Sequence, residues 1–319
     1  MSGSSGGQEG VQRDGLVLAA VDIGTNTLKF SVARCYPDGR IEPLDERNDT
    51  VRLGAGIERT GGIDPERLDR AVRTLVTFEQ AGRDQGARRF VGVATEALRV
   101  ASNGQEFLDR VRRETAWEIR TISGDEEARL TFLGLRSWLP ADGPGAIVDI
   151  GGGSTEVVAT IGGDIESASS VPIGSGRVAD RWFRADPPGR EALRNAEQDA
   201  RAFLESRASV LDGRGGVLLL SGGNGQFIDM LRAHFGLGAA LDEQVIRLVL
   251  ERLADEPADS IATVLGIQRE RAAVLPAGVA IAVAVASAVC PDRIVAVPSG
   301  IRTGLLRDVI ERDGFASLR

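Results

Sequence analysis

The chain has 319 residues, 42% hydrophobic and 26% charged, an ordinary composition for a soluble globular protein of about two domains. Its net charge of −8 argues against a general nucleic-acid binder. Two cysteines and one histidine exclude a disulfide framework and a histidine metal cluster, and they argue against a Ser-His-Asp triad. Because Lys29 is the single lysine, carboxylates, hydroxyls, arginines and backbone amides must carry most of any chemistry.

Two segments bear on location. Residues 1–14 are rich in Gly and Ser and lack the apolar core of a signal peptide, so we expect a disordered tail. Residues 272–290 are apolar, but Pro276 and Gly278 interrupt them, which favours a buried helix over a membrane span. We expect a cytoplasmic protein without a membrane or nucleic-acid partner.

An internal repeat organises the chain. Residues 21–27 read VDIGTNT and residues 148–154 read VDIGGGS. Each copy follows an apolar run and precedes an alternating run, a tight turn and another strand-like run. This pattern predicts strand, glycine turn, strand, turn, strand in both copies. A separation of 127 residues between the copies is a domain length, so we infer two similar domains.

The remaining elements alternate between helix and strand. Asp64 and Pro65 resemble an N-cap and first helical position. Further helices are predicted at 103–115, 124–138, 190–208, 241–254 and 302–312, and strands at 88–95, 118–123, 215–223 and 293–300. The strand at 215–223 runs into a third glycine turn, Ser221-Gly222-Gly223. The alternation predicts an α/β fold.

The two repeated turns have a shared chemistry. A strand delivers a carboxylate, Asp22 or Asp149, and the glycines that follow let several backbone N–H groups converge on one anion. Such loops suit phosphate, and the two aspartates suit Mg²⁺. They lack the Walker A lysine, and a strand rather than a dinucleotide-fingerprint helix follows each of them. A plain hairpin turn explains one such loop equally well, but not two matched copies.

Two charged side chains between the repeats, Glu127 and Arg99, are candidate functional residues. Ser123 and Glu126 fit a capping box, which leaves the neighbouring Glu127 free either for catalysis or as a solvated first-turn acid. Arg99 follows the strand at 88–95, where it could grip phosphate bidentately or lie on the surface.

Four blocks, VDIGTNTLKFSVA, VATEALR, ISGDEEARLTF and IVDIGGGSTEVV, together resemble the Ppx/GppA family of exopolyphosphatases and guanosine pentaphosphate phosphohydrolases. The resemblance implies two ribonuclease-H-like domains of the actin-like ATPase superfamily with a cleft between them. It also implies Mg²⁺-dependent release of terminal phosphate, with Glu127 as the catalytic carboxylate and Asp149 and Asp22 at the metal. The phosphate-binding set would be Asp22, Gly24, Thr25, Asn26, Thr27, Arg99, Gly151, Gly152, Gly153, Ser154, Thr155, Glu156, Gly222 and Gly223.

The predicted domains are 15–130 and 131–319, with the last helix, about 303–312, packing back on the first domain. Asn224, Ala273 and Thr303 depart from the family pattern, all on the second-domain side, where we expect substrate preference to be set.

The function expected from this reading is an exopolyphosphatase that acts on inorganic polyphosphate with Mg²⁺. Mn²⁺ is an alternative to Mg²⁺, and a monovalent cation could also bind. Rival functions are hydrolysis of guanosine pentaphosphate, a sugar-kinase-like phosphotransferase, and a sensor that binds polyphosphate or a guanosine penta- or tetraphosphate without turnover. A homodimer is also expected, because it would lengthen the channel of such a short chain.

Overall fold

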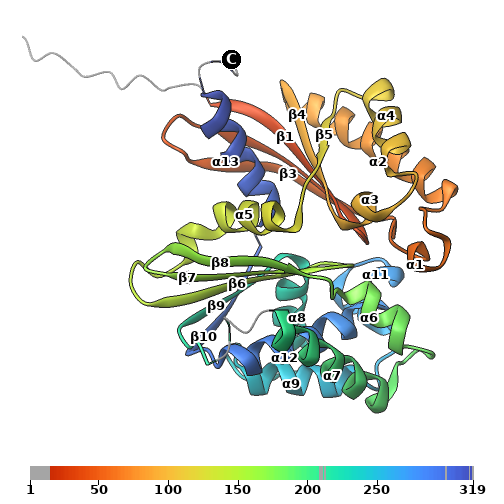
Figure 1. The fold of residues 1–319 in the computed structure, drawn as a ribbon, viewed down its shortest axis with the longest axis vertical. Helices are drawn as coiled ribbons and strands as arrows, with labels where there is room; N and C mark the ends of the chain where they lie inside the picture. The colour runs from red at the N-terminus through yellow and green to blue at the C-terminus, as the bar shows by residue number, and fades with distance from the viewer. Residues whose placement is uncertain (1–14, 208–210, 212, 299, 316, 318–319) are drawn as a thin grey trace, which may run out of the picture.

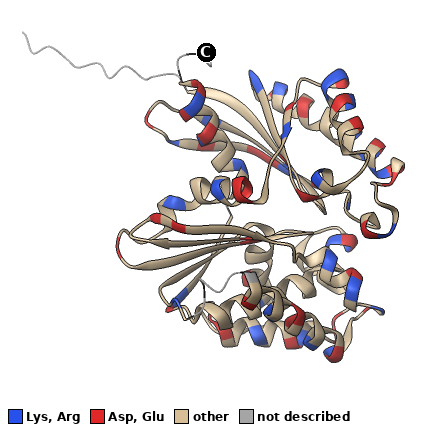
Figure 2. Ribbon diagram, in the orientation of Figure 1, with Lys and Arg blue, Asp and Glu red and all other residues tan. Residues whose placement is uncertain are grey.

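The computed structural model describes residues 15–207, 211, 213–298, 300–315 and 317. The predicted disordered tail, 1–14, lies outside the described residues. Two five-stranded sheets form the frame, one above the other in Figure 1, and helices pack on both. Charged residues gather on the outer helices, whereas the central strands carry few of them (Figure 2).

The first sheet contains the first copy of the repeat. Its strands are β1 (Leu16–Ile23), β2 (Thr27–Cys35), β3 (Ile41–Thr50), β4 (Arg89–Ala94) and β5 (Glu118–Thr121), in the order β3-β2-β1-β4-β5. The first three strands are antiparallel, and β4 and β5 run parallel to β1. β1 is buried along almost its whole length because both faces of the sheet are covered. The associated helices are α1 (Ile57–Thr60), α2 (Pro65–Asp84), α3 (Glu96–Val100) and α4 (Gly104–Glu114).

The second sheet repeats this topology. Its strands are β6 (Pro144–Ile150), β7 (Thr155–Ile161), β8 (Asp164–Val171), β9 (Val217–Ser221) and β10 (Arg293–Val297). Their order, β10-β9-β6-β7-β8, is that of the first sheet, with β6 in the place of β1. The antiparallel and parallel pairings also correspond. The repeat seen in the sequence is therefore a repeat of strand order.

Helices of the second half build its main core. They are α6 (Ser175–Trp182), α7 (Gly189–Arg207), α8 (Gly222–His234), α9 (Glu243–Leu253), α10 (Ala258–Leu265), α11 (Arg269–Ala272) and α12 (Leu275–Val289). Among the described residues, the stretch Arg269–Val289 is long and apolar enough to cross a membrane. An 18-residue window of it has a mean hydropathy of 2.3, but 83% of that window is buried inside the protein. That burial is typical of a core helix, as expected for 272–290.

Two helices lie where the halves meet. α5 (Gly124–Leu135), continued by a 3-10 turn η1 (Arg136–Trp138), packs on the second sheet and also contacts α13 (Ile301–Asp313), which covers β1 and β2 of the first (Figure 1). α5 and α13 approach so closely that a Cβ on Gly304 would overlap the carbonyl of Leu130. The predicted domain boundary at residue 130 lies inside α5 and stays a prediction.

The cap predicted at the start of α2 is confirmed. The Asp64 carboxylate accepts hydrogen bonds from the amides of Glu66 and Arg67, as an N-cap should. One element differs from expectation: Gly222 and Gly223 do not form a free turn but begin α8 directly after β9. Gly222 has a φ of 69°, which glycine adopts without strain, and this permits the abrupt change from strand to helix.

Candidate active site

The two repeated loops face each other between the sheets. In the first, the Gly24 amide donates to the Thr27 carbonyl at 3.2 Å, and in the second the Gly151 amide donates to the Ser154 carbonyl at 2.9 Å. A side chain on Gly152 would collide with the amide group of Asn26. Only glycine at this position lets the loops approach so closely.

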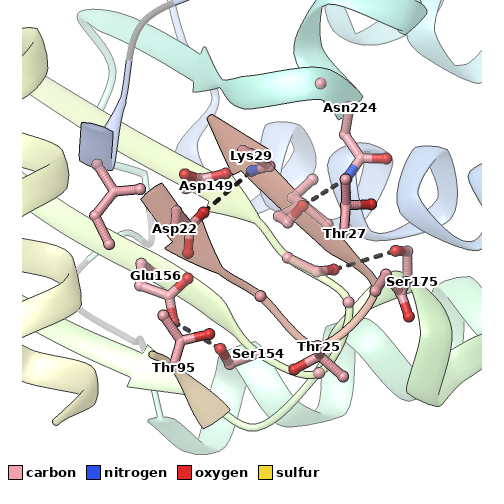
Figure 3. A pocket seen from close by; sticks show the side chains of 18 of the residues that line it. Asp22, Thr25, Thr27, Lys29, Thr95, Asp149, Ser154, Glu156, Ser175 and Asn224 are labelled. Carbon is pink, nitrogen blue, oxygen red and sulfur yellow. Dashed lines mark hydrogen bonds and ion pairs between the residues drawn. The ribbon is translucent and has the colours of Figure 1, made fainter. Parts of the chain in front are cut away.

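A cavity lies between these loops (Figure 3). Most of the predicted site residues line it: Asp22, Gly24, Thr25, Asn26, Thr27, Glu127, Asp149, Gly151, Gly152, Gly153, Ser154, Glu156 and Gly223. They come from the ends of β1 and β6, the starts of β2 and β7, and the first turns of α5 and α8. The fold thus brings together residues up to about two hundred positions apart in the chain.

Asp22 closes the cavity on the first-sheet side. It lies opposite Lys29 in the β1–β2 register, and the Lys29 Nζ is 3.7 Å from Asp22 Oδ2 (Figure 3). Its other oxygen, Oδ1, is buried without a hydrogen-bond partner. Burial raises the pKa of Asp22, Lys29 opposes that rise, and Asp149 adds to it. An unsatisfied buried carboxylate oxygen is an open position for a cation or a donor.

The second sheet presents two carboxylates in the corresponding place. Asp149 lies opposite Glu156 in the β6–β7 register. Glu156 is buried and accepts hydrogen bonds from the hydroxyls of Ser154 at 2.8 Å and Ser170 at 2.7 Å. Burial, followed by the charge of Asp149, raises the pKa of Glu156 to about 8. The second loop therefore holds excess negative charge that a proton or a metal ion can offset.

Glu127 lies in the first turn of α5 and faces the cavity. Ser123 caps this helix by accepting from the Glu126 amide, but the Glu126 carboxylate turns away to pair with Arg120. The expected reciprocal capping box is thus only half formed. Glu127 Oε2 is buried without a hydrogen-bond partner, 3.9 Å from Arg99 Nη1.

The surroundings of Glu127 strengthen its hold on a proton. Burial is the largest cause that raises the pKa of Glu127 well above its usual range, followed by the charges of Glu156 and Asp22; Arg99 lowers it. A carboxylate poised in this way near a cavity is typical of a general base or acid.

Three predicted site residues do not line the cavity. Arg99 Nη1 donates to the Ile122 carbonyl at 2.6 Å, so this arginine braces the β5–α5 connection and the Glu127 carboxylate. Thr155 is fully buried and its hydroxyl donates to the Ile173 carbonyl at 2.5 Å. Gly222 lines an adjoining opening beside Asp149. The phosphate-binding roles predicted for these three residues stay predictions.

The cavity also contains Asn224, one of the departures from the family pattern, and residues that the sequence reasoning missed: Lys29, Thr95, Ser175, Arg271 and Ile301. Lys29 had a local signal, because it follows Thr27 by two residues on the same strand and therefore shares its face. Arg271 had none. It reaches from α11 to donate to the Thr27 hydroxyl at 3.0 Å and stacks on Phe227 with its Cζ 4.9 Å from the ring centre.

Arg271 is suited to bind an anion. Burial lowers its pKa to about 10, which leaves the guanidinium charged at neutral pH. Beside Lys29 it is the second cationic side chain of the cavity, against the four carboxylates of Asp22, Glu127, Asp149 and Glu156. Because the pKa values of Glu127 and Glu156 are raised, protons on these two carboxyls offset part of the negative charge of the cavity.

This donor set fits Mg²⁺ that is bound together with phosphate. Within the part of the chain that the structure describes, no three His, Cys, Asp or Glu side chains form a ready metal cage. Mg²⁺ is commonly held by only one or two carboxylates plus phosphate oxygens and water. The open Oδ1 of Asp22 and the acidic pair of Asp149 and Glu156 are consistent with that arrangement.

The two matching sheets with their facing aspartate–glycine loops define a two-domain protein with the ribonuclease-H-like, actin-like ATPase fold. The solved structure of the Aquifex aeolicus PPX-GPPA enzyme has this fold, matches with a TM-score of 0.73 at 26% identity, and covers 92% of this chain and 99% of that one. The model of the Ppx/GppA phosphatase family matches residues 31–313, so the chain belongs to that family.

Curated relatives agree with this assignment. Exopolyphosphatase 1 of Mycobacterium bovis is 34% identical over 177 residues, which are 55% of this chain and 52% of the relative. The chain thus spans about half the length of the first curated relatives it matches. Exopolyphosphatase 1 of Mycobacterium leprae is 29% identical over 310 residues, 94% of this chain and 91% of that protein.

Proposed function

We propose that the protein is an exopolyphosphatase that releases terminal orthophosphate from inorganic polyphosphate. The observation that carries the proposal is Glu127, a buried carboxylate with an unpartnered oxygen that faces two glycine loops across one cavity. Membership of a phosphatase family and relatives named exopolyphosphatase support it.

In this mechanism the loops and cations hold the terminal phosphoryl group. Backbone amides of the glycine loops, Lys29 and Arg271 bind its oxygens. Asp149 and Asp22 are the carboxylates that would hold Mg²⁺, which neutralises phosphate charge when bound. Phosphoryl transfer relies mainly on such positioning and charge neutralisation.

Glu127 supplies the remaining step. Its carboxylate orients a water and accepts a proton as the water oxygen bonds to phosphorus and the bridging P–O bond breaks. The shortened chain leaves with the bridging oxygen, and the released orthophosphate contains the oxygen of the water. Arg99, 3.9 Å from Glu127, keeps the carboxylate aimed at the cavity.

The test is a panel of phosphate-release assays on long polyphosphate, tripolyphosphate, ATP and guanosine pentaphosphate under identical conditions. We expect the highest kcat/KM with polyphosphate. A higher value with guanosine pentaphosphate would instead support the alternative nucleotide hydrolase. Binding of either anion without release would support a sensor. The cytoplasmic location, the homodimer and the preference among Mg²⁺, Mn²⁺ and monovalent cations stay predictions.

A further inference from the structure

A second, larger groove adjoins the catalytic cavity. It shares Thr25, Asn26, Gly152, Gly153 and Val274 with the cavity and extends between α1 and α3 of the first half and α6 of the second (Figure 1). Its charged lining comprises Arg52, Arg59, Arg177, Arg181 and Arg184 with Glu58, Glu96, Asp180 and Asp186. A phosphate chain whose end lies in the cavity can continue into this groove.

A partly buried ion pair lies where the groove meets the cavity. Glu96, at the start of α3, has 6% of its surface exposed, and its Oε1 accepts from Arg177 Nη2 on α6 at 2.7 Å. The other oxygen, Oε2, is buried without a hydrogen-bond partner. A Cβ on Gly153 would overlap Oε2 and would lie 2.9 Å from the Thr25 hydroxyl. The Glu96 carboxylate therefore lies directly against the point where both glycine loops meet.

Arg177 is fully engaged in this arrangement. Its Nη1 donates to the Pro172 carbonyl at 2.9 Å, and its Nε lies 3.2 Å from Glu58 Oε1. The two acidic partners differ in setting, because the Glu58 side chain is 73% exposed and the Glu96 side chain only 8%. Water screens the first interaction, whereas the second acts at short range in a medium of low polarity.

Glu96 and a phosphate chain would compete for the same guanidinium. Phosphate oxygens bind arginine with the geometry that a carboxylate uses. A chain that crosses from the cavity into the groove also meets the negative charge of Glu96 itself. Both effects oppose the entry of phosphates beyond those held in the cavity, and they act most strongly on a chain long enough to reach the groove.

We infer that Glu96 and Arg177 form a chain-length selectivity pair, in which Glu96 occupies Arg177 until a polyphosphate long enough to enter the groove displaces it. This inference rests on the proposed function. Arg177 then binds the displacing chain, and Glu96 limits the affinity that additional phosphates would otherwise contribute. Glu96 acts on specificity without touching the reacting phosphorus.

The test measures dissociation constants in a Glu127→Gln background, in which turnover is suppressed, for tripolyphosphate and for long-chain polyphosphate. Added Glu96→Gln is expected to tighten long-chain binding about tenfold, the scale of one close charge contact, and to change tripolyphosphate binding by less than about twofold. Added Arg177→Gln is expected to weaken long-chain binding selectively. Glu58→Gln is the matched control, because it removes the exposed acid from the same guanidinium and should shift either constant by less than about twofold.

Several outcomes overturn the inference. Unchanged or weaker long-chain binding by Glu96→Gln does so, as does an equal shift for both chain lengths, which would indicate a structural role. If Glu96→Gln does not fold, the Arg177→Gln variant tests the inference. Equal weakening of tripolyphosphate and long-chain binding by that variant contradicts a chain-length selectivity pair. A protein with intact Glu127, Glu96 and Arg177 that neither binds nor hydrolyses polyphosphate refutes the proposed function together with the inference.

Discussion

The two hairpins of the repeat have the same topology but opposite electrostatics. In the first, Asp22 lies across from Lys29, and in the second, Asp149 lies across from Glu156 at the corresponding register position. The first hairpin thus neutralises its own aspartate, whereas the second places two carboxylates side by side. Because Lys29 in the first hairpin corresponds to Glu156 in the second, the second half is the one that needs an external cation or a proton to offset its charge.

This contrast gives each half a separate part in a shared site. The first half contributes Lys29, and Glu127 reaches the cavity from α5, which packs on the second sheet. The second half contributes the acidic pair and Arg271, whose hydrogen bond to Thr27 links it to the first loop. The acidic net charge of the chain is therefore compatible with an anionic substrate, because cations are placed locally.

The largest expected effect tests whether both hairpins serve one reaction centre. Glu127→Gln should reduce kcat by about 10²–10⁴-fold while polyphosphate binding is retained, because it removes the base and leaves the loops intact. Phosphate release and a binding titration measure the two quantities. Near-normal release by this variant would remove Glu127 from the mechanism.

Metal dependence tests the electrostatic contrast directly. A chelator should abolish turnover, and Asp149→Asn should raise the Mg²⁺ concentration needed for half-maximal rate by at least about tenfold. Asp22→Asn should raise it less, since Lys29 already offsets that charge. Rates measured over a series of Mg²⁺ concentrations test both variants. A larger rise for Asp22→Asn than for Asp149→Asn would contradict the proposed difference between the hairpins.

The pH dependence of stability sharpens the same contrast. Because the pKa of Glu156 is raised to about 8 in the folded protein, this carboxyl stabilises the fold at low pH, and that contribution is lost as pH rises from about 4.5 to 8. In chelator, Glu156→Gln should flatten this fall, which we expect to be on the order of a few kcal/mol. Denaturant unfolding at several pH values measures it, with Asp164→Asn, an exposed acid at the start of β8, as the control.

The smallest effect concerns the second loop's buried threonine. Thr155→Val should lower the free energy of unfolding by about 1 kcal/mol, because the Ile173 carbonyl loses its donor, and should leave kcat and KM close to their original values. Thr27→Val is the informative comparison, since its hydroxyl accepts from Arg271 and its loss should raise KM. A large rise in KM for Thr155→Val would restore this residue to the phosphate site.

The sequence predicted the loops more completely than the side chains around them. The Asp-Gly turns follow local rules of strand, glycine and hydroxyl, so both loops were predicted at the right residues. Arg99, Thr155 and Gly222 share those local signals but do not line the cavity. The side chains of Arg99 and Thr155 donate to backbone carbonyls, and Gly222 begins a helix. Whether a polar side chain faces a cavity or a neighbouring carbonyl depends on packing that short patterns do not encode.

The sequence by itself determined the duplicated strand–turn–strand units, the scarcity of His, Cys and Lys, and therefore a chemistry of carboxylates and backbone amides. The tertiary structure alone decided that Arg271 reaches Thr27 and that Glu96 meets Arg177. These pairs are separated by 244 and 81 positions in the chain. Periodicity and capping act over a few residues, whereas such contacts arise only when the two sheets pack against α5 and α13 and bring their loops together.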